Sequence, residues 1–211
     1  GGGHALAQLA LAHTPDRPVL LDAGCGEGYY SAGLFQTLAQ AGKSPRLAGV
    51  DLSKHALRRA AKRVPDGEFA VASVYHLPVA DGVADLLVDC FSPLALTEFW
   101  RGLKPGGWFL YVVPGARHLW ELKQVLYDRP YPNEEKQTPY PGFAYRAIRE
   151  VDFTAHLPDP QTIQDLFQMT PYFWKTPKEG AARLAALPSL DTTVSFRVHV
   201  FQKAGQEEGT P

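Results

Sequence analysis

A short apolar run followed by three closely spaced glycines is the feature that most constrains the fold of this chain. Residues 19–22 read Val-Leu-Leu-Asp, and Gly24, Gly26 and Gly28 follow at every second position. The apolar run predicts a buried strand, and the apolar positions within residues 31–38 predict a helix soon after the glycines. Glycine permits a positive φ and lets a ligand approach the backbone. The segment therefore predicts a ligand-binding loop at the carboxyl end of a strand.

The remainder of the first 127 residues continues this alternation of strands and helices. Apolar runs predict the strands, and apolar stripes of helical period predict the helices between them. The further strands are expected over residues 47–51, 68–73, 84–89 and 108–113, and the further helices over residues 4–13, 54–64, 97–103 and 117–127. Strands that alternate with helices at short spacing indicate βαβ units and a parallel sheet covered on both faces.

The pattern changes after Arg129. Residues 130–142 contain four prolines and no apolar period, which indicates a loop. A strand of mixed pattern is expected over residues 143–156, followed by short helices over residues 161–167 and 177–187. We expect residues 130–160 to form a lid or a substrate-recognition insertion.

Residues 193–202 alternate strictly between apolar and polar side chains. The alternation predicts a half-exposed strand at or near a sheet edge, beside an antiparallel neighbour. The side chains expected to point outward are those of Ser195, Arg197 and His199. We expect one domain over residues 1–203 and a flexible tail over residues 204–211.

Composition limits the partners and the covalent chemistry. The 211 residues are 45% hydrophobic and carry a formal net charge of −1, whereas a domain that holds nucleic acid by surface charge alone is usually basic. Any RNA contact must therefore come from a local basic patch or from a part outside this chain. Cys25 and Cys90 are too few for a disulfide framework or a four-cysteine zinc site, so no metal is expected. Without a membrane-length apolar run or a signal peptide, we expect a cytoplasmic location.

Two acids near the glycine loop indicate its ligand. Asp22 precedes the loop, and Asp51 ends the second strand, where an acid in such folds binds the two hydroxyls of a ribose. The G-x-G-x-G spacing differs from the G-x-G-x-x-G of nicotinamide sites. A carboxylate at Asp22 suits a cationic amino-acid ligand better than a pyrophosphate. The loop therefore favours S-adenosylmethionine over a dinucleotide, while a plain glycine turn is the minority interpretation.

The D-x-G-C-G-x-G loop resembles motif I of the class I methyltransferases. Longer segments resemble the RlmA-type 23S rRNA guanine-N1-methyltransferases, a group that includes tylosin-resistance enzymes: LDAGCGEGYYSAGL, VDLSKHALRRAAKR, FAVASVYHLP, LKPGGWFLYVVPGARHLWELK and QMTPYFW. The resemblance implies a doubly wound, Rossmann-like α/β methyltransferase fold with a mostly parallel sheet and an antiparallel C-terminal strand. It also implies S-adenosyl-L-methionine as the cofactor and N1 of a guanine in 23S rRNA as the methyl acceptor.

The resemblance further implies a set of cofactor-binding residues. Gly24, Gly26 and Glu27 would lie along the methionine part of the cofactor. Asp51 would bind the ribose, with Leu52 beside the adenine.

The same resemblance implies two more cofactor contacts, and the sequence departs from the family pattern at two points. Ser73 stands where many relatives keep an acid that faces the adenine amine, and His118 would reach the cofactor from the loop after the fifth strand. The family carries a cysteine- and histidine-rich zinc module upstream that this sequence lacks. Family members also often place an aromatic residue where this chain has Ala5. Both departures concern RNA binding more than cofactor binding.

The candidate residues for binding and deprotonating the methyl acceptor lie mainly near the end of the fourth strand. Asp89 could act as the general base that takes the proton from guanine N1, or it could be a hydrogen-bonded acid at a strand end. Phe91 and Pro93 could flank a flipped base by stacking. Arg117 is a candidate RNA contact near the expected cleft.

The cations of the helix over residues 54–64 favour a solvated face over a phosphate contact; they are Lys54, Arg58, Arg59, Lys62 and Arg63. Two alternative functions stay open. The chain could be a small-molecule methyltransferase of the same fold, or a module that binds the cofactor without turnover.

Overall fold

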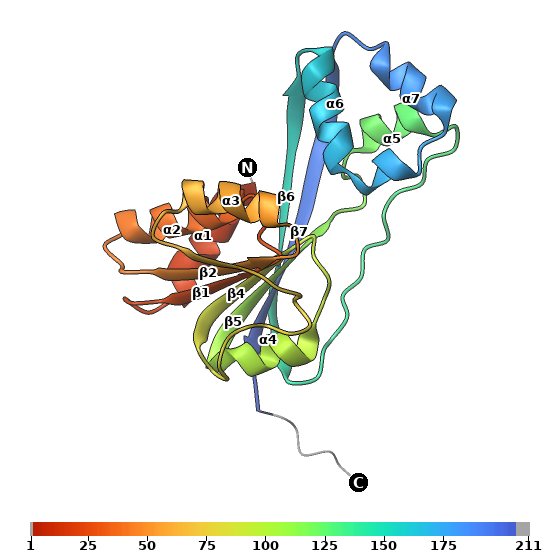
Figure 1. Ribbon diagram of the computed structural model, residues 1–211. Coiled ribbons are helices and arrows are strands. Elements are labelled where there is room, and N and C mark those ends of the chain that lie inside the picture. Colours follow the sequence, from red (N-terminus) through yellow and green to blue (C-terminus); the bar gives the residue numbers. More distant parts are fainter. Residues whose placement is uncertain (1, 206–211) are drawn as a thin grey trace. The chain divides into compact units, whose positions relative to one another are not determined.

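The computed structural model describes residues 2–205, so residues 206–211 of the expected tail lie outside the described part. Seven strands form one sheet in the order β3-β2-β1-β4-β5-β7-β6. Their bounds are β1 Val19–Ala23, β2 Arg46–Asp51, β3 Glu68–Val71, β4 Ala84–Cys90, β5 Leu103–Pro114, β6 Phe143–Leu157 and β7 Leu190–Lys203. The pairs among β1 to β5 are all parallel, and β7 is the antiparallel strand (Figure 1). The expected fold class is confirmed.

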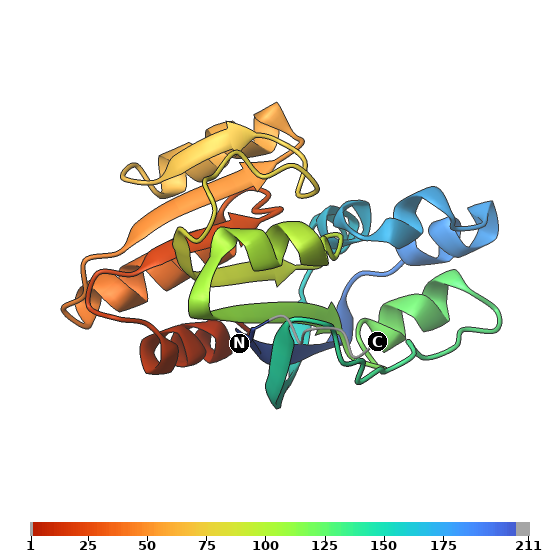
Figure 2. The same cartoon turned by 90° about the horizontal axis from the view of Figure 1, so that it is seen from below.

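Helices cover both faces of the sheet where β1 to β5 lie (Figure 2). On one face are α1 (Gly2–His13), α2 (Tyr29–Gln40) and α3 (Lys54–Arg63), and on the other is α4 (Leu96–Gly102). The later helices are α5 (Trp120–Leu126), α6 (Pro160–Met169), the 3₁₀ helix η1 (Pro171–Trp174) and α7 (Lys178–Ala185). Within the described residues, every helix is too short or too polar to cross a membrane.

The chain forms two compact units. The sheet unit takes in the chain up to Val113, residues 137–149, and the chain from Arg197 onward. The helical unit takes in Pro114–Lys136 and Glu150–Phe196, and so contains α5, α6, η1 and α7. It has a core of its own, built from Leu119, Leu122, Leu126, Leu157, Ile163, Phe167 and Leu184.

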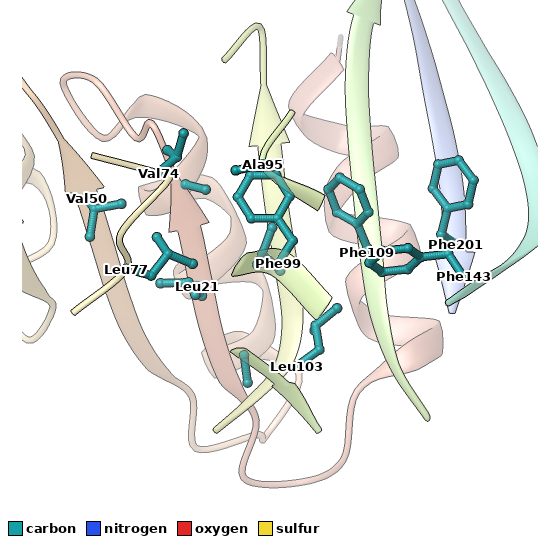
Figure 3. Packing of buried hydrophobic residues seen from close by; sticks show 13 residues of the cluster. Leu21, Val50, Val74, Leu77, Ala95, Phe99, Leu103, Phe109, Phe143 and Phe201 are labelled. Carbon is teal, nitrogen blue, oxygen red and sulfur yellow. The ribbon is translucent and has the colours of Figure 1, made fainter. Parts of the chain in front are cut away.

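One hydrophobic core of the sheet unit lies between the sheet and α4 (Figure 3). Phe109 of β5 is at its centre, with ring centroids 5.3 Å from Phe99 of α4 and 5.8 Å from Phe201 of β7. Burying each of these rings contributes on the order of 1.5–3 kcal/mol. Because Leu21 of β1 joins the same cluster, this core fixes the strands whose carboxyl ends carry the predicted site.

The prediction of a half-exposed last strand is wrong in one respect. β7 lies next to the sheet edge, as expected, but two side chains expected to point outward are buried: Ser195 is 7% exposed and His199 only 5%. Neighbouring strands cover His199: the rings of Tyr111 in β5 and Tyr145 in β6 lie 6.1 and 5.7 Å from its ring centroid, and the Tyr145 hydroxyl is hydrogen-bonded to its Nδ1. Aromatic neighbours on both sides therefore bury a position that alternation alone assigns to the surface.

Gly180 of α7 allows close packing inside the helical unit. A Cβ at this position would lie 2.0 Å from the backbone oxygen of Leu126. We expect Gly180→Ala to destabilise the protein by about 1–3 kcal/mol, because the backbone of α5 cannot move aside as a side chain can. Urea unfolding measures the change. The control is Gly33→Ala in α2, where no heavy atom lies within 4 Å of the new Cβ and we expect a gain of about 0.5–1 kcal/mol. Equal stability of the two variants would contradict this packing.

Candidate functional site

The loop that follows β1 is anchored to the end of β2. The backbone N–H groups of Gly24 and Cys25 both donate to the carbonyl oxygen of Val50, each at 2.9 Å. The loop closes with a bond of 3.1 Å from the Gly28 N–H to the Cys25 carbonyl oxygen. These bonds fix the glycine loop at the carboxyl edge of the sheet before any ligand is present.

Asp51 joins this loop to the start of α3. Its Oδ2 accepts the Gly26 N–H at 2.9 Å, and its Oδ1 accepts the Ser53 N–H at 2.8 Å. Ser53 in turn caps α3, because its Oγ accepts the Ala56 N–H at 3.1 Å. A carboxylate oxygen accepts more than one hydrogen bond, so both oxygens keep capacity for hydroxyl donors.

Two glycines of the loop serve different purposes. Gly24 has φ +75°, and a Cβ there would lie 1.8 Å from Ser92 Oγ, so the turn after β4 packs directly on the loop. Gly26 has φ +56°, and no heavy atom lies within 4 Å of the position its Cβ would take. The space over Gly26 is therefore open, as a ligand lying along the loop requires.

Exposed apolar side chains lie at the same edge of the sheet. The described part of the sheet unit has five large apolar residues that are between 48% and 75% exposed, and each lies at or after the carboxyl end of one of the strands β1 to β4; they are Tyr29, Leu52, Val71, Tyr75 and Phe91. We call these five residues the apolar rim. Apolar surface gathered at one edge of a folded unit is typical of a ligand site. Tyr29, Val71 and Tyr75 were not among the predicted site residues.

Asp22 lies beneath the loop on the α2 side of the sheet. It is buried, and the Ser31 hydroxyl of α2 donates to its Oδ2. Burial raises the pKa of Asp22 to about 6, the Ser31 bond lowers it in part, and the nearby charge of Asp51 raises it further. A positive charge near the loop would favour the ionised form of this carboxyl.

Asp89 lies on the opposite, α4 side, at the end of β4. Its Oδ1 accepts the Ser92 N–H at 3.0 Å, and its Oδ2 has no hydrogen-bond partner among the described residues. Burial raises the pKa of Asp89 to about 8, with a smaller contribution from Asp22. Buried polar atoms without a partner are uncommon, so this carboxyl is a candidate for ligand contact.

The turn after Asp89 combines backbone strain with exposure. Phe91 adopts φ +56°, which is uncommon for a residue other than glycine, and its side chain is 48% exposed. Pro93 is exposed as well. Such conformations cluster at binding sites, and Ser92 between them touches the glycine loop at Gly24.

The other predicted residues of the sheet unit also lie at this edge. Glu27 forms an ion pair of 3.2 Å with Arg59 of α3. Ser73 Oγ accepts the Tyr75 N–H at 3.1 Å in the turn after β3, and Leu52 belongs to the apolar rim. The sheet unit thus brings together ten of the twelve predicted residues: Asp22, Gly24, Gly26, Glu27, Asp51, Leu52, Ser73, Asp89, Phe91 and Pro93.

The two remaining predicted residues belong to the helical unit. His118 Nδ1 accepts the Ser195 N–H at 3.1 Å, and burial together with the Lys123 charge lowers the His118 pKa to about 4. The guanidinium of Arg117 lies 4.7 Å from the centroid of the Trp120 ring. His118 is therefore neutral near pH 7, and its contact with a cofactor stays a prediction.

The cysteine thiols near this edge are not ionised. Burial raises the pKa of Cys25 to about 12 and that of Cys90 well above its ordinary value, so both thiols stay protonated at neutral pH. Within the described residues, no three His, Cys, Asp or Glu side chains lie close enough to hold a metal ion.

The part of the chain that forms this edge of the sheet matches a known protein family. Residues 21–111 match the family model of the methyltransferase domain. The match runs from β1 into β5 and includes the glycine loop, Asp51 and Asp89.

Two relatives match most of the chain. A protein named as a candidate 23S rRNA (guanine-N(1)-)-methyltransferase, YxjB of Bacillus subtilis, is 35% identical over 87% of this chain and 66% of its own length. The 23S rRNA (guanine(748)-N(1))-methyltransferase of Streptomyces fradiae is 32% identical over 87% of this chain and 65% of its own length. The chain thus spans about two thirds of the length of these relatives.

Two further similarities are narrower. A malonyl-[acyl-carrier protein] O-methyltransferase of Yersinia pestis is 34% identical over 58% of this chain and 46% of its own length. Among solved structures, a candidate methyltransferase from Bacillus halodurans superimposes with a TM-score of 0.61 at 13% identity, covering 97% of this chain and all of that one. This last likeness supports the fold alone. Together the fold, the matched domain and the relatives confirm the predicted family: the chain belongs to the class I methyltransferases, whose cofactor is S-adenosyl-L-methionine.

Proposed function

We propose that this protein transfers a methyl group from S-adenosyl-L-methionine to N1 of a guanine in 23S rRNA. One observation carries the proposal: the two rRNA methyltransferase relatives match over 190 residues each. A match of that length extends well beyond the methyltransferase domain at residues 21–111 and takes in most of the segments of the helical unit. The cytoplasmic location expected from the sequence goes with this substrate and stays a prediction.

Methylation of a carrier-bound carboxylate is the second candidate. Four malonyl-[acyl-carrier protein] O-methyltransferases match over 116 to 133 residues, at 30% to 36% identity. Since these matches cover only 50% to 58% of the chain, they are close to what a shared cofactor-binding domain alone would give. The rRNA substrate is therefore the better supported of the two.

The residues at the carboxyl edge of the sheet fit the cofactor. The open space over Gly26 would accommodate the methionine part, with Gly24 and Glu27 beside it, and Asp51 would offer its oxygens to the ribose hydroxyls. Leu52 and the turn at Ser73 would contact the adenine. The buried carboxyl of Asp22 favours a ligand that carries positive charge near the loop. We retain His118 as a contact from the helical unit.

The turn after β4 is the proposed acceptor site. Bound S-adenosyl-L-methionine supplies an electrophilic methyl group on a sulfonium centre. Phe91 and Pro93 would hold a flipped guanine by stacking, since both are exposed and their turn touches the glycine loop through Ser92. Alignment of acceptor and donor in this way can supply much of the rate enhancement. Arg117, exposed and beside Trp120, is the proposed RNA contact in the helical unit.

Asp89 is the proposed proton acceptor. Guanine N1 carries a proton at neutral pH, so formation of the N1–CH₃ bond requires that this proton leave. The Asp89 carboxylate would take it through Oδ2, the oxygen that has no partner in the described structure. With a pKa of about 8, the carboxyl is matched to this task near the upper end of the physiological range. The alternative is an acid that only shapes its turn through Ser92.

A methyl-transfer assay tests the substrate. The protein is incubated with tritiated S-adenosyl-L-methionine and either an unmodified 23S rRNA transcript or malonylated acyl carrier protein. We expect label in the RNA and, after digestion to nucleosides, in 1-methylguanosine. Label on the carrier protein with none in the RNA would replace the first candidate by the second. If the protein binds the cofactor but labels neither substrate, while a known methyltransferase for each substrate labels it, both candidates would be contradicted.

The ribose assignment is tested with Asp51→Asn. Because hydrogen bonds to a charged group contribute about 1.5–3 kcal/mol, we expect S-adenosyl-L-methionine to bind roughly 10- to 100-fold more weakly in calorimetry. Asp85→Asn is the matched control, since Asp85 also holds a backbone N–H, that of Val19, but at the amino end of β4. The control loses similar bonds and should bind the cofactor normally. Equal affinities of the two variants would remove the ribose assignment.

The role of Asp89 is tested by the pH dependence of turnover. If the ionised carboxylate takes the proton, kcat/KM of the wild type should rise with pH, by about tenfold per unit, and level off above pH 8. Asp89→Asn should lower kcat/KM and lose this inflection. An inflection near pH 8 that survives in the variant would exclude Asp89 as the base.

Unfolding of the same two proteins is the control for this pH experiment. Burial raises the pKa of Asp89 in the folded state, so the folded state binds an extra proton between about pH 4 and pH 8 and the wild type loses stability as the pH rises through that range. Asparagine does not titrate, so the stability difference should shift in favour of Asp89→Asn from pH 5 to pH 8. This shift reports on burial alone. If it appears while kcat/KM shows no inflection, Asp89 is a structural acid.

A further inference from the structure

We infer that the exposed face of α3 binds the phosphate backbone of the RNA substrate, through a row formed by Lys54, Arg58 and Lys62, which we call the α3 stripe. The inference rests on the proposed function and deepens it. It also revises the sequence-based interpretation of these cations as a merely solvated face.

The charge of α3 has one sign. Its ten residues include five Lys or Arg and no Asp or Glu, although the whole chain has 22 acidic and 21 basic residues. Three other helices mix the signs: α4 has Glu98 and Arg101, α5 has Glu121 and Lys123, and α7 also has both. Solvated helix faces commonly interleave both signs, so a purely cationic face indicates a polyanionic partner.

The five cations of α3 fall into two groups. Arg59 and Arg63 turn to the neighbouring loop, where Arg59 pairs with Glu27 and the Arg63 guanidinium lies 6.0 Å from the centroid of the Tyr29 ring. The three residues of the α3 stripe are exposed and form no ion pair or side-chain hydrogen bond with the described part of the chain. They are also spaced by four residues, so they follow one line along the helix, about 6 Å apart.

This spacing matters energetically. Like charges four residues apart on a helix repel each other, and no acid on α3 offsets the repulsion. A chain of phosphates would neutralise all three charges and release its own condensed counterions. A regular row of cations suits a polymer with one charge per repeat better than the irregular surface of an acidic protein.

The position of α3 connects the stripe to the proposed reaction site. The helix begins directly after Asp51 and is capped by Ser53, and Arg59 touches the glycine loop at Glu27. Leu57 and Ala60 are buried on the opposite side of the helix, so its orientation is fixed by packing. RNA held along the stripe would therefore run beside the apolar rim, close to exposed Tyr29.

The test compares two triple variants with the full chain. The stripe variant is Lys54→Gln, Arg58→Gln, Lys62→Gln, and the control is Arg17→Gln, Arg46→Gln, Lys178→Gln, which removes the same charge from exposed positions outside α3. Binding of a labelled 23S rRNA fragment is measured by fluorescence anisotropy at several KCl concentrations. Calorimetry with S-adenosyl-L-methionine confirms that each variant keeps the cofactor site.

We expect the stripe variant to bind RNA more weakly and to lower the slope of log affinity against log salt by about 2–3, since each phosphate contact contributes about 0.7 to 0.9. The control should keep the wild-type slope. Wild-type slope and affinity in the stripe variant, with RNA methylation intact, would overturn the inference and leave the proposed function standing. A wild type that neither binds nor methylates the RNA would overturn both, and binding to an acidic carrier protein that depends on the stripe would assign the surface to that partner.

Discussion

The Asp51 carboxylate is the interaction on which the candidate site depends. One oxygen holds the Gly26 N–H of the loop after β1, and the other holds the Ser53 N–H at the start of α3. Two segments separated by about 25 residues are thereby fixed by a single side chain. Because the loop N–H groups of Gly24 and Cys25 are also held by β2, the loop geometry is set by the sheet itself. A ligand that binds there meets a prepared surface and loses little free energy in ordering it.

The same edge concentrates carboxyl groups in a poorly solvated place. Asp22 and Asp89 lie on opposite faces of the sheet, each is buried, and each has its pKa raised mainly by that burial. Asp51 adds a third carboxyl, which binds the loop through the Gly26 N–H. None of the three carboxyls forms an ion pair with a described residue, whereas Glu27 of the loop pairs with Arg59. Such a site favours a ligand with positive charge, which agrees with a sulfonium cofactor and explains why an acid precedes the glycines.

The sequence predicts the sheet unit well because its signals are local. Apolar runs mark β1 to β5, the cap at Ser53 marks the start of α3, and each expected strand agrees with the structure to within a few residues, apart from an earlier start of β5 at Leu103. The errors arise where distant segments decide the outcome. His199 is buried by Tyr111 and Tyr145, which no alternation pattern can reveal. The helix expected from Arg117 begins only at Trp120, because Leu119 adopts φ +54° and its N–H donates to the Thr193 carbonyl oxygen.

The site was predictable to a similar degree and for the same reason. Motif spacing identifies Asp22, the glycines and Asp51, whereas the apolar rim appears only when four strand ends are brought together. Net charge is the least informative of the sequence measures. A value of −1 argues against a nucleic-acid partner only if charge is spread evenly, and here ten residues of α3 carry five cations without an acid. A surface electrostatic potential of several kT depends on such a local excess of one sign of charge and not on the net charge of the whole chain. A nearly neutral methyltransferase can therefore present a basic surface to RNA beside a site whose own carboxyls select a cationic cofactor.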